Sequence, residues 1–437
     1  MQLSNSIPMN TPPMGWNSWD CYGASVTEAE VKSNADYMAR NLASHGWRYV
    51  VVDIQWYEPA ANGSQYRKFA DLCMDAYGRL IPAESRFPSA VDGKGFKPLA
   101  DYVHGLGLLF GIHIMRGIPR QAVHDNTPIL NSSNTAREIA HPYSICPWNT
   151  DMYGIQQSRP GAQAYYDSIL QLYAEWEVDF LKVDDISFTE FGADSYAGKA
   201  EIEMIHSAIT RCGRPIQLSL SCGPTPVEHA SHLCRHANMW RITADLWDRW
   251  EDVCDVFHKC ALWAPYIGDN HWPDADMLPL GHLSIRGSEH GVGERYSRLT
   301  FEEQRSMITL WCMARSPLFF GGNLSDCDSA TLALVTNDEV LAINQRGSSP
   351  QPMPKLSNDP RVVVWTSKLD DKLCVAVFNL DNIPVDVEMD IQTIGLGDRC
   401  ELRDLWAHTE LGCYENRFVV HMETHGCRLL QLQTNNG

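Results

Sequence analysis

Six charged side chains of this chain stand where apolar runs end, and they are of the types that hydrolyse glycosidic bonds. They are Asp53, Lys182, Asp184, Asp185, Arg241 and Asp245. Glycoside hydrolysis needs two carboxyl groups, one ionised and one protonated, and different surroundings move their pKa values apart. A neighbouring lysine or arginine keeps a carboxylate ionised or binds a sugar hydroxyl. A carboxylate at a strand end also commonly caps a helix or forms an ion pair, so the residue types alone leave a structural role open.

Alternating helix and strand patterns over the first 340 or so residues would bring these side chains together. Residues 49–52 form an unbroken run of Tyr and Val, which is typical of a strand buried on both faces in a parallel sheet. Thr27 and Thr300 are each followed three residues later by Glu, and this capping box predicts the start of a helix. With a first strand near residues 14–17 and another near Trp272, we expect the eight strands of a (β/α)₈ TIM barrel. The carboxyl ends of its strands share one rim, so side chains far apart in sequence converge there.

The pattern changes at residues 346–354, a segment rich in Pro and Ser that we interpret as a linker. The segments beyond it read as short strands with no convincing helix between them, so we expect a C-terminal antiparallel β-sandwich. The predicted domains are a catalytic barrel over residues 1–345 and a β-sandwich over residues 346–437. The expected strands of the sandwich lie at residues 362–365, 373–378, 385–389 and 427–432.

The composition limits the partners. The 35 Lys and Arg against 54 Asp and Glu give a net charge of −19, which argues against nucleic acid and anionic membranes because both bind clustered positive charge. A neutral small-molecule glycoside or oligosaccharide fits better. No apolar stretch of about 18 residues and no signal-peptide pattern is present, so we expect a cytoplasmic protein without a membrane span. A homo-oligomer is compatible with the sequence.

Neither a metal nor a cofactor is expected. The 14 cysteines form no CxxC pair and are expected to be reduced thiols that mostly pack in the core. The chain has no HExxH or His-x-His pair, so we predict no catalytic metal. No GxGxxG follows a strand and no phosphate-binding loop is present, so we predict no nucleotide cofactor.

Four motifs occur in an order that matches a known family. They are Thr11-Pro12-Pro13-Met14-Gly15-Trp16-Asn17-Ser18-Trp19, Leu181-Lys182-Val183-Asp184, Arg241-Ile242-Thr243-Ala244-Asp245 and His271-Trp272-Pro273-Asp274-Ala275-Asp276-Met277-Leu278. They resemble glycoside hydrolase family 27, the α-galactosidases and α-N-acetylgalactosaminidases of the melibiase-like clan, in a divergent bacterial-type branch. The resemblance covers the whole barrel and extends to residues 337–345. It implies a barrel followed by an antiparallel β-domain, in agreement with the patterns above.

The resemblance also implies roles for individual residues. Asp184 matches the nucleophile, which forms a covalent glycosyl-enzyme, and Asp245 matches the general acid/base. The implied activity is a retaining, exo-acting α-glycosidase that removes terminal galactose-type residues. Positions that match substrate contacts are Trp19, Asp53, Lys182, Arg241, Asp276 and Met277, and we add Cys222 from the loop after the fifth strand.

Two departures from the family leave the preferred sugar open. Galactoside-specific members usually carry two aspartates after the second strand, whereas this chain has Asp53-Ile54; a charged hydrogen bond of this kind is worth about 1.5–3 kcal/mol. Where α-galactosidases tend to have Cys-Glu-Trp, this chain has Ser221-Cys222-Gly223, which leaves space for a 2-acetamido group. The alternatives are an α-N-acetylgalactosaminidase and a β-L-arabinopyranosidase, whose sugar shares the ring configuration of the galactoside but lacks carbon 6.

Two hypotheses come from other classes of protein. The altered segments could belong to a carbohydrate-binding protein with little or no turnover, although both catalytic aspartates are retained. A metal-dependent hydrolase on the same barrel would lose activity with a chelator, and the sequence offers it little support.

Overall fold

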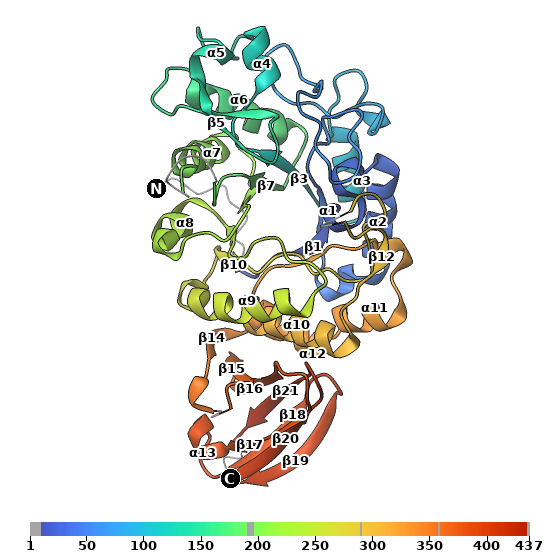
Figure 1. Ribbon diagram of the computed structural model, residues 1–437, viewed down its shortest axis with the longest axis vertical. Coiled ribbons are helices and arrows are strands. Elements are labelled where there is room, and N and C mark those ends of the chain that lie inside the picture. Colours follow the sequence, from blue (N-terminus) through green and yellow to red (C-terminus); the bar gives the residue numbers. More distant parts are fainter. Residues whose placement is uncertain (1–9, 190–195, 289–290, 357–358, 435–437) are drawn as a thin grey trace.

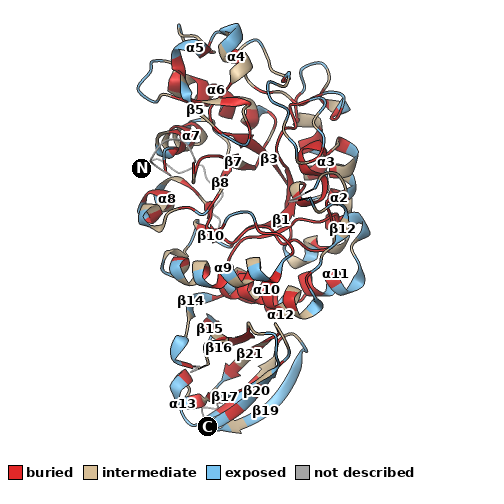
Figure 2. Cartoon of the chain, viewed as in Figure 1, coloured by how far each residue is buried: buried red, intermediate tan, exposed pale blue. Residues whose placement is uncertain are grey.

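The computed structural model describes residues 10–189, 196–288, 291–356 and 359–434. Figure 1 shows two bodies, a large one built of strands and helices and a smaller all-β one at the C-terminal end. Figure 2 shows that the buried residues gather on the inner strands and on the inward faces of the surrounding helices.

The large body is a barrel of eight parallel strands. The strands pair in the order β10-β9-β8-β7-β3-β2-β1-β13, and a parallel bridge from Leu278 to Phe320 joins the two ends of the sheet. The predicted (β/α)₈ barrel is therefore confirmed. The strands are β1 (Met14–Asn17), β2 (Tyr49–Val52), β3 (Leu109–Met115), β7 (Phe180–Asp184), β8 (Gln217–Leu220), β9 (Met239–Arg241), β10 (Trp272–Asp274) and β13 (Leu318–Phe320).

Helices cover the outside of this sheet. The predicted capping box at Thr27 opens α2 and the one at Thr300 opens α10, so both predicted helix starts are confirmed. In α2, Val31, Ala35 and Met38 are fully buried at helical spacing, which fixes the face that packs on the barrel. The covering helices are α2 (Glu28–Asn41), α3 (Lys97–Gly105), α6 (Ala162–Glu175), α7 (Lys199–Arg211), α8 (Ala230–His236), α9 (Trp250–Trp263), α10 (Phe301–Met313), α11 (Ser329–Val335) and α12 (Asp338–Arg346).

Long connections at the carboxyl ends of the strands build up the rim. The connection after β3 leaves the barrel for a small antiparallel sheet of order β4-β6-β5, drawn with its two helices in teal at the top of Figure 1. The sequence analysis did not predict this sheet, because its strands are short and do not alternate regularly. Its elements are β4 (Ile118–Pro119), α4 (Arg120–Asp125), α5 (Ala136–Ile139), β5 (Ala140–Ile145) and β6 (Met152–Ile155); elsewhere on the rim lie α1 (Trp19–Tyr22), β11 (His282–Leu283) and β12 (Arg295–Tyr296).

The C-terminal body is an antiparallel β-domain, as predicted. One sheet has the order β14-β15-β16-β21-β18-β19, and β17 pairs with β20 in a second. A separate apolar core lies between them, with Val364, Val377 and Phe418 among its buried residues. The elements are β14 (Ser348–Pro352), β15 (Val362–Leu369), β16 (Lys372–Asn379), β17 (Val385–Asp390), α13 (Ile391–Ile394), β18 (Arg399–Asp404), β19 (Thr409–Glu415), β20 (Arg417–Met422) and β21 (Cys427–Gln433).

Two sequence interpretations of this region need correction. Residues 346–354 are not simply a linker, because β14 pairs with β15 as an edge strand, where the two prolines of Ser348–Pro352 are tolerated. Strands β18, β19 and β20 were not predicted. In β19 nearly every side chain is exposed, so it carries no apolar alternation, whereas Arg417–Met422 alternates fully and could have been recognised.

The two bodies pack against each other through α9 and α10. The rings of Trp250 and His425 stack at 4.6 Å, and those of Phe257 and Phe378 meet edge to face at 4.9 Å. The indole Nε1 of Trp406 also donates to Thr309 across 2.9 Å. The β-domain thus lies on the outer helices of the barrel, away from the rim (Figure 1).

Among the described residues, no helix combines the length and the apolar composition needed to cross a membrane. All 14 cysteines lie within the described ranges, and none of them forms a disulfide.

Candidate active site

One cavity of about 370 Å³ opens at the carboxyl ends of the barrel strands, and its volume lies within the range of small-molecule sites. All nine residues that the sequence analysis selected line it. They are Trp19, Asp53, Lys182, Asp184, Cys222, Arg241, Asp245, Asp276 and Met277. The barrel topology brings them together, because they follow six different strands whose carboxyl ends share this rim.

Asp53 and Lys182 form a buried ion pair at the base of the cavity. The Lys182 ammonium lies 2.9 Å from Oδ2 of Asp53, and the Asn17 amide donates to the same oxygen over 2.7 Å. Burial alone would raise the pKa of Asp53, but the charge of the nearby Lys182 and the hydrogen bond from the Ile54 N–H outweigh it and hold that pKa well below its usual range. Burial lowers the pKa of Lys182, but the neighbouring carboxylates of Asp53 and Asp184 raise it by more, so the pKa is higher than usual. The pair is therefore ionised.

Asp184 ends strand β7 with one carboxylate oxygen bonded on each side. Oδ2 lies 3.1 Å from Nε2 of His113, and Oδ1 accepts the backbone N–H of Asp185 over 2.8 Å. Burial raises the pKa of Asp184, but the hydrogen bond from His113 and the charge of Lys182 lower it by more. Asp184 is thus an ionised carboxylate, 13% exposed, facing the cavity, as a nucleophile requires.

Arg241 connects the two carboxylates on the opposite wall. Its Nη2 lies 2.7 Å from Asp276 and 3.1 Å from Asp245, while its own side chain is only 4% exposed. Burial raises the pKa of Asp276, and the charge of Arg241 lowers it. The pKa stays above its usual value because the neighbouring Asp245 and Asp274 carboxylates also raise it. The Asp245 side chain is 59% exposed, in contrast to Asp184. Asp184 and Asp245 thus have different surroundings, as paired catalytic carboxyls need.

Five aromatic residues line the cavity, and three of them are in ring contact with one another. The ring of Trp19 stacks on Tyr66 at 6.2 Å with an interplanar angle of 13°, and Tyr66 contacts Trp148 at 5.6 Å. Phe188 and Trp247 also line the cavity. Trp19 was expected from the family resemblance as a substrate contact, whereas the other four rings were not, because they lie in long loops without a periodic pattern.

Two further acids, Asp20 and Asp185, line the cavity. The Asp20 carboxyl packs against the backbone of Gly321, where a Cβ would come within 1.9 Å of Oδ2, and that oxygen accepts no hydrogen bond from the described residues. Burial and the carboxylates of Asp276, Asp245 and Asp53 raise the pKa of Asp20, and the charge of Lys182 only partly offsets this increase. Asp185 contacts Arg116 over 2.8 Å, yet burial raises the pKa of Asp185 to about 7.

Both departures from the family pattern lie at the cavity wall. Ile54 is 2% exposed and lines the cavity directly beside Asp53. In the other segment, a Cβ at Gly223 would come within 2.2 Å of the carbonyl oxygen of Thr243. The two backbone segments therefore pack too closely there for a side chain. Burial and nearby carboxylates raise the pKa of the Cys222 thiol, which argues against a reactive thiolate.

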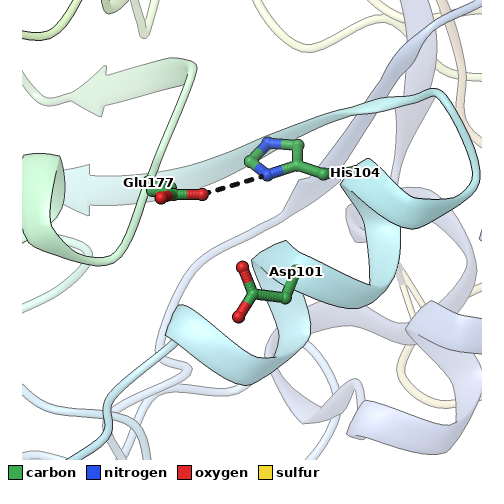
Figure 3. A group of neighbouring side chains, drawn as sticks. All are labelled: Asp101, His104 and Glu177. Carbon is green, nitrogen blue, oxygen red and sulfur yellow. Dashed lines mark ion pairs between the residues drawn. The ribbon is translucent and has the colours of Figure 1, made fainter.

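One group of side chains elsewhere could offer three ligand atoms to a metal ion, as judged from the described residues. Asp101, His104 and Glu177 converge between α3 and the end of α6 (Figure 3). Lys97 forms ion pairs with both acids of this group, and His104 Nε2 is 2.7 Å from Asp179. The group lies before β3 and β7, at the barrel end opposite the cavity, so its donors serve structural ion pairs.

Two family models match the chain. One described as alpha galactosidase A matches residues 152–346, and one described as the alpha galactosidase C-terminal beta sandwich domain matches residues 359–432. Among curated proteins, an α-galactosidase of Cyamopsis tetragonoloba is 28% identical, over 97% of this chain and 86% of that protein.

Solved structures are more similar. A family 27 β-L-arabinopyranosidase from Geobacillus stearothermophilus is 55% identical with a TM-score of 0.95, and the match covers 98% of this chain and 97% of that chain. A variant of that enzyme, solved with arabinose, superposes with a TM-score of 0.94 at 55% identity, over 97% of each chain. A chain from Bacillus halodurans, named provisionally as an α-N-acetylgalactosaminidase, is 48% identical with a TM-score of 0.87 over 97% of each chain.

Proposed function

The chain belongs to glycoside hydrolase family 27, and on this premise we propose that it removes terminal β-L-arabinopyranosyl residues with retention of configuration. Membership makes it a glycosidase of the α-galactosidase type, as its motifs predicted. Beyond this, we propose which sugar the enzyme prefers and which residues act on it.

Ile54 carries the choice of sugar. A galactose-specific pocket offers a second carboxylate beside Asp53, and this pocket offers a buried alkyl side chain. A β-L-arabinopyranoside presents a bare ring methylene there, which packs on an alkyl group without loss. A galactoside would bury its 6-hydroxyl against that group with no acceptor, at a cost of about 1–3 kcal/mol. The similarity to an arabinopyranosidase at 55% identity supports the same choice.

The reaction proceeds in two displacements. In the first, an oxygen of Asp184 bonds to the anomeric carbon while the bond to the aglycone oxygen breaks, and Asp245 gives its proton to that oxygen. In the second, water attacks the anomeric carbon, gives a proton to Asp245 and releases Asp184. Each displacement inverts the centre, so the product retains the starting configuration.

The surroundings of the two aspartates fit these roles. Asp184 receives hydrogen bonds at both oxygens and stays ionised, which suits a nucleophile. Asp245 stands 59% exposed at the cavity, where it can reach both a leaving oxygen and incoming water. Lys182 and Asp53 present charged atoms to ring hydroxyls, and Trp19 presents a flat apolar face to the sugar ring.

An α-N-acetylgalactosaminidase is the second candidate. Ser221, Cys222 and Gly223 have small side chains at the cavity wall, and the Bacillus halodurans chain carries that provisional name. A 2-acetamido group would need space beside this segment. The two candidates differ in their dependence on carbon 6 and carbon 2, so one substrate panel separates them.

The test is hydrolysis of nitrophenyl β-L-arabinopyranoside, α-galactoside and α-N-acetylgalactosaminide by the purified protein. We expect the highest kcat/KM on the arabinopyranoside, and NMR of the first-formed sugar should show retained configuration. Asp184→Ala should abolish turnover, while Asp255→Ala, which removes an exposed acid on α9, should not. A preference for another sugar, an inverted product or an active Asp184→Ala variant would each reject the corresponding part of the proposal. Arabinose binding without turnover would favour the carbohydrate-binding alternative.

We also propose that the protein acts in a reducing compartment, the cytoplasm. Fourteen thiols without a disulfide support this location, because exported proteins of oxidising compartments commonly pair their cysteines. Fractionation of cells that express the full-length chain tests it.

A further inference from the structure

A second cavity of about 750 Å³ lies beside the active-site cavity. It is built from the loop after β2 and from α4, α5 and the start of β6 in the small sheet on the rim. Its volume is in the range of ligand sites, and none of the residues assigned to catalysis or sugar binding lines it. The proposed function therefore leaves this cavity without a role.

The two cavities share a wall made of two chain segments. In the first segment Tyr66 lines the active-site cavity and Phe69 lines the second cavity. In the other segment Trp148 lines the active-site cavity and Thr150 lines the second. The rings of Tyr66 and Trp148 contact each other at 5.6 Å, which joins the two segments at the active-site cavity. Because the linings of the two cavities are three residues apart in one segment and two residues apart in the other, we expect a long ligand of the active-site cavity to extend towards the second cavity.

Phe69 is unusually exposed at the second cavity. Its side chain is 76% exposed, and its backbone has a φ of +58°, a left-handed conformation that is uncommon for a bulky residue. Such strain is found at ligand clamps, where it positions a side chain for binding. Arg120 lies between two rings, with its guanidinium carbon 4.5 Å from the Phe69 ring centre and 5.2 Å from that of Tyr153. The exposed part of the Phe69 ring, backed by Arg120 and Tyr153, offers a flat apolar platform of the kind on which sugar rings stack.

Backbone contacts hold this platform in place. The backbone N–H of Arg120 donates to the carbonyl of Asp151 over 2.8 Å, and its guanidinium donates to the carbonyl of Thr150 over 3.2 Å. The next residue, Gln121, accepts the N–H of Leu72 from the Phe69 loop over 2.8 Å. The two segments of the shared wall are thus tied to α4, and the cavity exists before any ligand arrives.

The polar groups of the cavity favour a neutral ligand. Asp71, Asp125 and Asp151 line it together with Arg120 and Arg137, so both signs of charge are present. The Arg137 guanidinium already donates to the carbonyl of His124 over 2.8 Å. Carboxylates and a guanidinium around flat apolar faces suit the many hydroxyls of a neutral glycan, which both donate and accept hydrogen bonds.

We propose that the second cavity binds the distal sugar units of a neutral oligosaccharide whose terminal residue occupies the active-site cavity. This inference rests on the proposed function, because it assigns the aglycone side of the same substrate. It makes a branched or linear glycan, in preference to a small aryl glycoside, the substrate for which the protein is built.

The test compares long and short substrates on the same variants. The long substrates are neutral oligosaccharides of galactan, xylan and arabinan type with one terminal β-L-arabinopyranosyl unit, and the short ones are the matching disaccharides and the nitrophenyl glycoside. In the wild type we expect kcat/KM for at least one long substrate to exceed that of its disaccharide by about 3- to 10-fold, as one aromatic contact would provide. Phe69→Ala should remove this advantage and leave the short substrates within about twofold. Phe69→Trp should restore it, and Tyr143→Ala, at an 82% exposed ring on β5, should change nothing.

Several results would overturn the inference. One is a wild type that cleaves no long substrate better than its disaccharide, and another is an equal loss on long and short substrates in Phe69→Ala. A shift in sedimentation with Phe69→Ala, without a change on any substrate, would make this face a contact between copies of the chain. If no arabinopyranoside is cleaved, the proposed function fails on its own. Calorimetry that compares Asp184→Ala with the double variant Asp184→Ala and Phe69→Ala, on the unsubstituted oligosaccharides, then still decides whether Phe69 contributes to binding.

Discussion

His113 lies with Nε2 3.1 Å from Oδ2 of Asp184, on the neighbouring strand of the barrel. The His113 side chain has no exposed surface, and its Nδ1 has no hydrogen-bond partner among the described residues. Because an ionised carboxylate can only accept, the proton of the ring belongs on Nε2. A buried histidine thus donates to the proposed nucleophile, and it does so from a residue to which the sequence analysis gave no role.

Replacing His113 with Phe should impair the nucleophile. Loss of the hydrogen bond removes the main influence that lowers the pKa of Asp184, so that pKa rises and the acid limb of the kcat/KM profile moves to higher pH. A hydrogen bond to a charged group is worth about 1.5–3 kcal/mol, which corresponds to a fall in kcat/KM of about 10- to 100-fold. Steady-state rates across pH measure both effects. His113→Gln keeps an N–H donor and should lose less; an unmoved acid limb in His113→Phe would contradict the assignment.

Ile54→Asp should shift the preferred sugar. A carboxylate beside Asp53 would accept from the 6-hydroxyl of a galactoside, and it would place a charge against the ring methylene of an arabinopyranoside. The ratio of kcat/KM for α-galactoside over β-L-arabinopyranoside should rise by about 10- to 100-fold. Ile54→Val keeps an apolar wall and should leave the ratio unchanged. If Ile54→Asp folds, as judged by its thermal midpoint, and the ratio stays constant, Ile54 does not read carbon 6.

Lys182→Met should destabilise the barrel, because it leaves Asp53 ionised and unpaired at 2% exposure. Breaking a buried pair by removing one partner costs about 3–5 kcal/mol. The folded-state pKa of Asp53 lies below its unfolded value, so the stabilisation exists above about pH 4 and is lost as the pH falls. Urea unfolding at pH 7 and near pH 3 should therefore show a deficit that shrinks in acid. The double variant Asp53→Asn with Lys182→Met should regain part of the loss, and a deficit independent of pH would argue against the ion pair.

Asp185→Asn should alter the pH dependence of stability. Burial raises the pKa of Asp185 to about 7 in the folded protein, against about 3.9 for an unfolded chain. Between these two values the folded state holds a proton that the unfolded state releases, so wild-type stability falls as the pH rises from about 4 to 7. In Asp185→Asn this decline is absent, and its thermal midpoint should gain on the wild type over that interval and stay level above it. Parallel midpoint curves for the two proteins would show that Asp185 does not titrate in this way; Asp255→Asn serves as an exposed control.

Much of the fold could be predicted from local patterns. The buried Val run of Tyr49–Val52 identified a strand of a parallel sheet, and the Thr-Glu boxes identified helix starts, because both signals arise from neighbouring residues. The rim sheet and strand β19 escaped prediction, since short strands and exposed strands bury too little apolar surface to leave a pattern.

For the site, the sequence by itself determined the family, the two proposed catalytic aspartates and the change at Ile54, because motifs preserve the order of residues along the chain. Only the tertiary structure decided which side chains meet: His113 with Asp184, Tyr66 with both Trp19 and Trp148, and Arg120 with Phe69. Barrel closure and long loops create these contacts between residues that are distant in sequence. The energy of these contacts depends on distance and burial, which no local sequence pattern encodes. For the same reason, the second cavity could not be predicted from the sequence.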